Sequence, residues 1–182
     1  MATGQNIEAM LGEAWAKRRV GDYSKARQLV EQAQDLCRVD DHNSMGRIYH
    51  IYMQFESDHE NYPKALEFCR ESLKHYQKGG NPNRIAHSTR HVADLLRTLG
   101  NTEDAEITYR DAIETYRRET GTFSGDLANA LRGYSLALEQ LKKYREAIDA
   151  WKEVRDLYET CQLEEGVAEA DQRLDLLQSN LI

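Results

Sequence analysis

A motif that recurs four times constrains the fold of this chain more than any other feature of the sequence. The related segments read GDYSKARQLVEQA, ENYPKALEFCRES, GNTEDAEITYRDA and KKYREAIDAWKEV, and they begin at Gly21, Glu60, Gly100 and Lys142. An alanine occupies the same position in each of them, at Ala26, Ala65, Ala105 and Ala147. This nearly constant interval of about 40 residues is typical of arrays in which one small structural unit stacks on the next.

The apolar residues after each alanine follow the period of an α-helix. A larger side chain stands four residues after the alanine, at Val30, Cys69, Tyr109 and Trp151. A further core position follows three residues later, at Ala33, Ser72, Ala112 and Val154. Offsets of four and seven residues place all three positions on one stripe of a helix, whereas a strand would require alternation at every second residue.

Each of these helices follows a second helical segment. We expect partner helices at residues 6–20, 42–58, 83–99 and 122–141, and a last helix at residues 164–178 that closes the array. The turns within the pairs are short, for example at residues 99–101, so the two helices of a pair must pack antiparallel. Asp22, Asn61 and Asn101 precede the first turns of three helices and are predicted to cap them through side-chain oxygens.

The sequence therefore predicts an all-α fold, a right-handed superhelical solenoid of four antiparallel helix pairs with a C-terminal closing helix. The repeats are expected at about residues 6–40, 42–78, 83–119 and 122–161, within a single predicted domain over residues 1–182. One helix pair cannot bury its own apolar stripe, so neighbouring pairs must stack. The recurring alanines allow helix backbones to approach closely, and the larger side chain fills the adjoining gap.

This pattern resembles the tetratricopeptide repeat (TPR) family. The family signature is a small residue in the first helix and a Gly-x-aromatic turn, followed by an alanine, a large apolar residue and a small residue in the second helix. The first repeat matches it with Ala14, Gly21-Asp22-Tyr23, Ala26, Val30 and Ala33, and the third with Ala93, Gly100, Ala105, Tyr109 and Ala112. The family's proline at the repeat end is absent. The length of about 40 rather than 34 residues resembles the longer variant found in kinesin light chains and bacterial peptide-sensing regulators.

The resemblance implies a protein- or peptide-binding function, because the first helices of such repeats line a concave face. Alignment of the first helices predicts a lining of twelve side chains: Trp15, Arg47, His50, Gln54, His87, Arg90, His91, Asp94, Arg97, Asn129, Arg132 and Leu136. Further positions on the same faces are Leu11, Arg18, Asp58, Glu139, Gln172 and Arg173. This lining is much more basic than the chain as a whole, whose formal net charge is −7.

Two interpretations of the basic lining remain open. Arginine suits the recognition of carboxylates and histidine adds charge at mildly acidic pH, so the groove would favour an acidic or C-terminal peptide segment. Alternatively, the arginines pair with neighbouring carboxylates on a solvated face, as expected for Asp94 with Arg90 or Arg97. Binding of chaperone C-terminal tails is not predicted, because Leu11 and Trp15 replace the lysine and asparagine that this binding mode needs.

Catalytic motifs are absent from the sequence, and we predict that the protein is not an enzyme. There is no glycine-rich phosphate loop, no GxSxG and no HExxH. His87 and His91 have a spacing that suits a metal, and His50 is expected beside them. No glutamate motif or cysteine ligand accompanies them, so no metal and no cofactor is predicted.

Composition limits the partners and the location. The acidic charge argues against nucleic-acid binding, and no apolar run of about 18 residues suggests a membrane span. Cys37, Cys69 and Cys161 are far apart and lack CxxC spacing, so they are expected to be free thiols. No secretory signal is visible at the start of the chain, and we therefore expect a cytoplasmic protein.

Two alternatives to a binding scaffold or adaptor are kept. The first is a structural homo-oligomerisation module, for which the end of the closing helix offers an apolar contact surface at Leu176, Leu177, Leu181 and Ile182. The second is the sensor part of a larger regulator.

Overall fold

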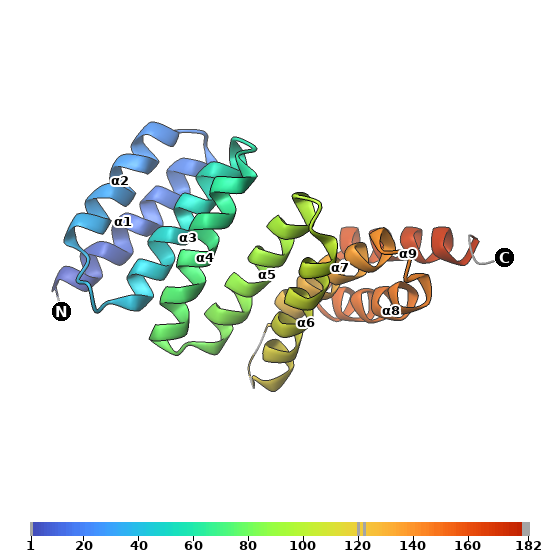
Figure 1. Cartoon of the computed structure of the whole chain (residues 1–182). Coiled ribbons are helices and arrows are strands. Elements are labelled where there is room, and N and C mark those ends of the chain that lie inside the picture. Colours follow the sequence, from blue (N-terminus) through green and yellow to red (C-terminus); the bar gives the residue numbers. More distant parts are fainter. Residues whose placement is uncertain (1, 120, 122, 180–182) are drawn as a thin grey trace. The chain divides into compact units, whose positions relative to one another are not determined.

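The computed structural model describes residues 2–119, 121 and 123–179, and this part of the chain contains nine α-helices and no strand. The helices are α1 (Ala2–Arg19), α2 (Tyr23–Leu36), α3 (His42–Asp58), α4 (Tyr62–Gly79), α5 (Pro82–Thr98), α6 (Thr102–Arg118), α7 (Ser124–Gln140), α8 (Tyr144–Thr160) and α9 (Glu164–Ser179) (Figure 1). The all-α prediction is confirmed. None of the described helices is both long enough and apolar enough to cross a membrane.

The chain divides into two compact units between Ser88 and Thr89, inside α5. Unit 1 contains α1 to α4 and the first part of α5, whereas unit 2 contains the rest of α5 and α6 to α9. In unit 1, α1 packs on α2, α3 packs on α4, and α3 also contacts α1 and α2. In unit 2, α7 packs against α6 and α8, and α8 packs against α9 (Figure 1). The chain is thus an all-α repeat solenoid, as predicted, while the repeat boundaries and the single domain stay predictions.

The recurrent positions of the motif form the core of both units. Its four alanines, Ala26, Ala65, Ala105 and Ala147, and its four larger residues, Val30, Cys69, Tyr109 and Trp151, are all fully buried. Full burial of one such larger apolar side chain stabilises the fold by roughly 1.5–3 kcal/mol. The indole Nε1 of Trp151 donates to Glu139 at 2.6 Å, so its one polar atom is also satisfied.

Three buried tyrosine rings lie directly on glycines of a neighbouring helix. The pairs are Tyr76 on Gly46, Tyr109 on Gly133 and Tyr158 on Gly166, and a Cβ at each glycine would lie 2.5–2.6 Å from a ring atom. Carbon atoms normally approach to about 3.5–4.0 Å, so a side chain at these glycines would collide with the ring. Small residues therefore set the distance between adjacent helices in both units.

The turn inside each helix pair has a residue in the left-handed conformation at the same repeat position. Gly21 and Gly100 have φ values of 81° and 84° there, which glycine adopts without steric cost. Glu60 and Lys142 take this position in the other two repeats with a φ of 59°. The turn geometry is therefore kept even where the family's glycine is not.

The predicted helix caps are only partly confirmed. The Asp22 carboxylate accepts a backbone N–H of the first turn of α2 at 3.2 Å, as expected. The predictions for Asn61 and Asn101 are wrong, because neither side chain forms a cap hydrogen bond. Asn61 donates instead to the Glu56 carboxylate at 2.8 Å, a stronger charge-assisted contact. Asp41, which was not predicted, caps α3 at 3.1 Å.

The predicted helix ends differ from the observed ones most at the beginning of the chain. Helix α1 starts at Ala2 rather than at residue 6, whereas the ends of α3 agree with the prediction. The predicted helix at residues 122–141 begins with Thr122, and the predicted apolar surface includes Leu181 and Ile182. These three residues lie outside the described residues.

Candidate functional site

A pocket of about 300 Å³ in unit 1 brings together four of the predicted site residues. It is lined by side chains from α1, α3, α4 and α5: Trp15, Arg47, His50, Ile51, Tyr76, Arg84 and His87. This volume lies at the lower end of the range for ligand pockets, so the pocket suits one side chain or a chain end rather than a whole peptide.

Aromatic rings form one wall of this pocket. The Trp15 ring stacks on His50 with a centroid distance of 6.1 Å and an interplanar angle of 22°. The His50 and His87 rings are 5.2 Å apart. Arg18 lies over the Trp15 ring, with its guanidinium carbon 4.9 Å from the ring centroid, and binds Asp58 at 2.6 Å. These contacts fix the half-buried indole at the edge of the pocket, in an orientation that leaves it partly accessible.

Two guanidinium groups give the pocket its positive charge, and their surroundings differ. Arg47 forms an ion pair with Glu8 of α1, which neutralises part of its charge. Both contacts that the structure shows for the Arg84 guanidinium are with Tyr76, to its hydroxyl at 3.4 Å and its ring at 5.5 Å. Burial raises the pKa of Tyr76, so its hydroxyl is neutral at physiological pH. The contacts of the Arg84 guanidinium are therefore with a neutral group, whereas Arg47 contacts a carboxylate.

In unit 2, three of the predicted residues, Arg90, His91 and Asp94 of α5, form a network with Tyr109 of α6. The Asp94 carboxylate accepts from Arg90 at 2.8 Å and from the Tyr109 hydroxyl at 2.6 Å, and His91 Nδ1 lies 3.5 Å away. Arg90 also donates to His91 Nε2 at 2.9 Å. Because that nitrogen accepts, the imidazole proton belongs on Nδ1, facing Asp94. These contacts join α5 to α6 and confirm the predicted pairing of Asp94 with Arg90.

Burial controls the charge states in this network. It is the main cause of the lowered pKa of His91, and the nearby Arg90 guanidinium adds to the effect. Burial alone would raise the pKa of Asp94, but the hydrogen bond from His91 and the charge of Arg90 bring it below the ordinary value. Neutral His91 beside ionised Asp94 is thus the favoured state near pH 7.

The other predicted residues also have partners inside their own unit. Arg132 in α7 binds Glu169 of α9 through two hydrogen bonds of 2.6 and 2.7 Å. Asn129 accepts from the Tyr158 hydroxyl at 2.8 Å. The unit 2 arginines Arg90 and Arg132 therefore follow the second interpretation, in which arginines pair with neighbouring carboxylates.

The remaining predicted positions have mixed environments. Gln54 accepts from Arg18 at 2.9 Å, and Arg97 interacts with the Tyr109 hydroxyl. Leu136 is half-buried in α7. Leu11 was expected on the exposed face, and this is wrong: it is fully buried in the core of unit 1 because α1 turns this position toward α2 and α3.

Sequence reasoning missed three residues that line the unit 1 pocket, namely Ile51, Tyr76 and Arg84. Tyr76 is buried in the core of unit 1 and also lines the pocket, where its hydroxyl accepts from Arg84. Arg84 stands three residues before His87 and therefore one turn earlier on the same side of α5. This spacing was the sequence signal that could have placed Arg84 beside His87.

Comparison with known proteins identifies the repeats. The tetratricopeptide repeat family model matches this chain at residues 44–118 and 85–160, which together span more than half of its length. No curated protein sequence shows significant similarity to the chain.

Several solved structures share the fold at low sequence identity. BtubC (BKLC) from P. vanneervenii has a TM-score of 0.65 and 16% identity, over 99% of this chain and 89% of that protein. A protein from Podosopora anserina described as a kinesin light chain with nearly identical TPR-like repeats has a TM-score of 0.67 and 12% identity, over 96% of both chains.

A third structure is similar over only part of its length. It is a Signal Transduction ATPase with Numerous Domains from Pyrococcus horikoshii, with a tetratricopeptide repeat sensor. The TM-score is 0.81 and the identity 18%, over 94% of this chain and 26% of that protein.

Proposed function

Because the chain belongs to the tetratricopeptide repeat family, whose repeats generally mediate protein–protein interactions, we propose that it is a protein-binding scaffold. In this proposal the pocket of unit 1 takes a carboxylate of the partner, either an acidic side chain or a chain end. The observation that carries it is that the Arg84 guanidinium and an aromatic wall line the same pocket of about 300 Å³.

The chemistry of the pocket favours a carboxylate over other groups. Arginine donates two parallel hydrogen bonds to a carboxylate, which a neutral ligand cannot exploit fully. The Trp15 ring beside it offers apolar area for the rest of the bound residue. In unit 2, Arg90 and Arg132 already hold Asp94 and Glu169, so the proposed selectivity depends on unit 1.

Fluorescence anisotropy with labelled peptides tests this proposal. One peptide carries glutamates and a free C-terminus, a second has the glutamates replaced by glutamine, and a third has an amidated C-terminus, which distinguishes side-chain from chain-end recognition. We expect Arg84→Gln to weaken binding of the preferred peptide about tenfold, the effect of losing one charge-assisted hydrogen bond.

The matched control is Arg70→Gln, which removes an exposed arginine of α4 that does not line the pocket. Quenching of Trp15 fluorescence would report whether the peptide enters the pocket. Equal affinity of the Arg84→Gln and Arg70→Gln variants for all three peptides would overturn the proposal.

The alternatives from the sequence also remain proposals. The fold similarity to a protein with a tetratricopeptide repeat sensor supports a role as the sensor part of a larger regulator, which the full-length reading frame would decide. A homodimer through the closing helix would use Leu176, which is half exposed, whereas Leu177 is buried in unit 2. Light scattering would show whether the protein is a monomer. The absence of enzymatic activity, metal, cofactor and nucleic-acid binding, and the cytoplasmic location, stay predictions.

A further inference from the structure

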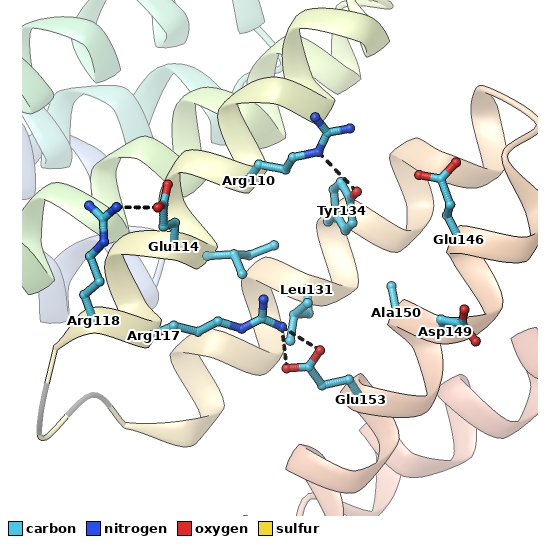
Figure 2. A pocket seen from close by; sticks show the side chains of 11 residues that line it. Arg110, Glu114, Arg117, Arg118, Leu131, Tyr134, Glu146, Asp149, Ala150 and Glu153 are labelled. Atoms are coloured by element: carbon cyan, nitrogen blue, oxygen red, sulfur yellow. Dashed lines mark hydrogen bonds and ion pairs between the residues drawn. The ribbon is translucent and has the colours of Figure 1, made fainter.

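A groove of about 760 Å³ in unit 2 has walls of opposite charge. One wall is formed by α6 with Arg110, Glu114, Arg117 and Arg118, and the other by α8 with Glu146, Asp149 and Glu153 (Figure 2). None of these residues belongs to the face that the repeat alignment predicted as a binding site. The groove is therefore a second surface, independent of the pocket in unit 1.

The floor of the groove is apolar and already well packed. Ile113, Leu131 and Ala150 lie between the walls, and each is less than a tenth exposed. The half-buried Tyr134 of α7 completes the floor, and its hydroxyl is 3.4 Å from Arg110. Ile107, which is 56% exposed, stands one turn before Arg110 on α6 and continues this side of the helix. An occupant would gain some apolar contact here, but its charges must supply most of the selectivity.

Each arginine of the α6 wall already contacts a carboxylate, Arg110 that of Glu106 and Arg118 that of Glu114 on the same helix. The third ion pair spans the groove and shows which charges fit each wall. Arg117 of α6 contacts both carboxylate oxygens of Glu153 in α8 at 2.7 Å (Figure 2). Both side chains are about half exposed, at 52% and 40%. Such exposed pairs contribute little stability, so a ligand can replace this one at small cost. The replacement must offer a carboxylate to Arg117 and a cation to Glu153.

We propose that this groove binds an amphipathic helix of a partner protein, with acidic residues on the flank that faces α6 and basic residues on the flank that faces α8. The lining residues of α6 extend from Arg110 to Arg118, which corresponds to about 12 Å or two helical turns. A helix that presents an apolar stripe over two turns matches this length. A wholly anionic ligand such as a nucleic acid fits poorly, because Glu146, Asp149 and Glu153 would repel it.

Synthetic helical peptides of about 16 residues with one common leucine stripe test the proposal. The first has glutamates on one flank and lysines on the other, the second has glutamates on both flanks, and the third has lysines on both. A fourth repeats the first with a central proline that breaks the helix. Since a helix can enter in either direction, exchanging the two flanks would not be a control, whereas the single-sign peptides are.

The native protein is expected to bind the mixed peptide about tenfold more tightly than either single-sign peptide, because each exposed ion pair changes an equilibrium by up to about fivefold. The proline peptide should lose this binding, and higher salt should weaken it. In the double variant Glu146→Lys/Asp149→Lys the α8 wall becomes basic, so the preference should move to the peptide with glutamates on both flanks.

The control Asp111→Lys/Asp175→Lys makes the same change in net charge at two exposed residues that do not line the groove. It should retain the preference of the native protein for the mixed peptide. Circular dichroism verifies that both double variants are folded. Equal binding of all four peptides, no binding at millimolar peptide, or the same preference in both double variants would overturn the proposal.

Discussion

Replacing Gly133 by alanine should destabilise unit 2, although alanine is the better helix former. A Cβ at Gly133 would lie 2.5 Å from Cε1 and 2.6 Å from Cζ and the hydroxyl oxygen of Tyr109. Normal carbon–carbon contact requires about 3.5–4.0 Å, so the ring would have to move by about 1 Å. Tyr109 is fully buried and its hydroxyl is held by Asp94 at 2.6 Å, which leaves the ring little room.

The expected magnitude is the balance of two effects. Overpacking a buried site typically costs about 1–3 kcal/mol, whereas Gly to Ala inside a helix gains about 1 kcal/mol. Gly133→Ala should therefore lose up to about 2 kcal/mol. Gly12 in α1 is the matched control, because it is exposed and a Cβ there would meet no atom within 4 Å. Gly12→Ala should gain most of the roughly 1 kcal/mol that alanine contributes in a helix, so the unfolding free energies of the two variants should differ by about 1–3 kcal/mol.

Urea unfolding followed by tryptophan fluorescence measures this difference. The chain has two tryptophans, the fully buried Trp151 in unit 2 and Trp15 in unit 1, so a Trp15→Phe background reports unit 2 alone. Gly12→Ala is measured in parallel through Trp15 together with circular dichroism. A further variant, Tyr109→Leu, removes the ring that the new Cβ would meet. In the Tyr109→Leu background, Gly133→Ala should therefore become stabilising. A stabilising Gly133→Ala on its own, or a penalty that persists beside Tyr109→Leu, would refute the packing argument.

Two further predictions concern protonation and capping. Because the pKa of His91 is lowered in the folded protein, the unfolded chain binds more protons below about pH 6.5, so unit 2 should lose stability as the pH falls from 7 to 5. His91→Gln, which can keep both neutral hydrogen bonds, should flatten this decline in urea titrations, and an unchanged slope would contradict the assignment. Asp41→Ala should cost about 1 kcal/mol in stability through loss of the α3 cap, whereas Asn101→Ala, at a helix start where the side chain forms no cap bond, should change stability by only a few tenths of a kcal/mol. Thermal melts by circular dichroism compare the two variants, and equal losses would argue against the cap.

The fold could be predicted from the sequence because the repeat marks residues that must be buried together. Ala26 and Val30, or Ala147 and Trp151, are recognisable from spacing alone, and the stacking of helices follows from it. The caps were less predictable, since whether Asn61 caps α4 depends on the competing carboxylate of Glu56, which only the folded turn brings near.

The candidate site could be predicted only in part, because the sequence does not show which residues of different helices meet. Trp15, Arg47, His50 and His87 were found because first helices can be aligned, and they do share one pocket. The ion pair of Arg132 could not be predicted in this way, because its partner Glu169 is 37 residues away in the sequence. The unit 2 groove was missed because Arg117 and Glu153 belong to second helices, whose charged residues alone suggest a solvated surface.

The arginines of this chain show why residue type cannot by itself locate a binding surface in such repeats. Arg132 and Arg90 satisfy the repeat alignment, yet each already holds a carboxylate in an ion pair less exposed than that of Arg117 with Glu153, so a ligand would replace these pairs at a higher cost. Arg84 lies outside the aligned set, yet its contacts are with the neutral Tyr76. We therefore expect Arg84→Gln to weaken binding of a carboxylate peptide more than Arg132→Gln does, and a direct comparison of the two variants by fluorescence anisotropy separates these contributions.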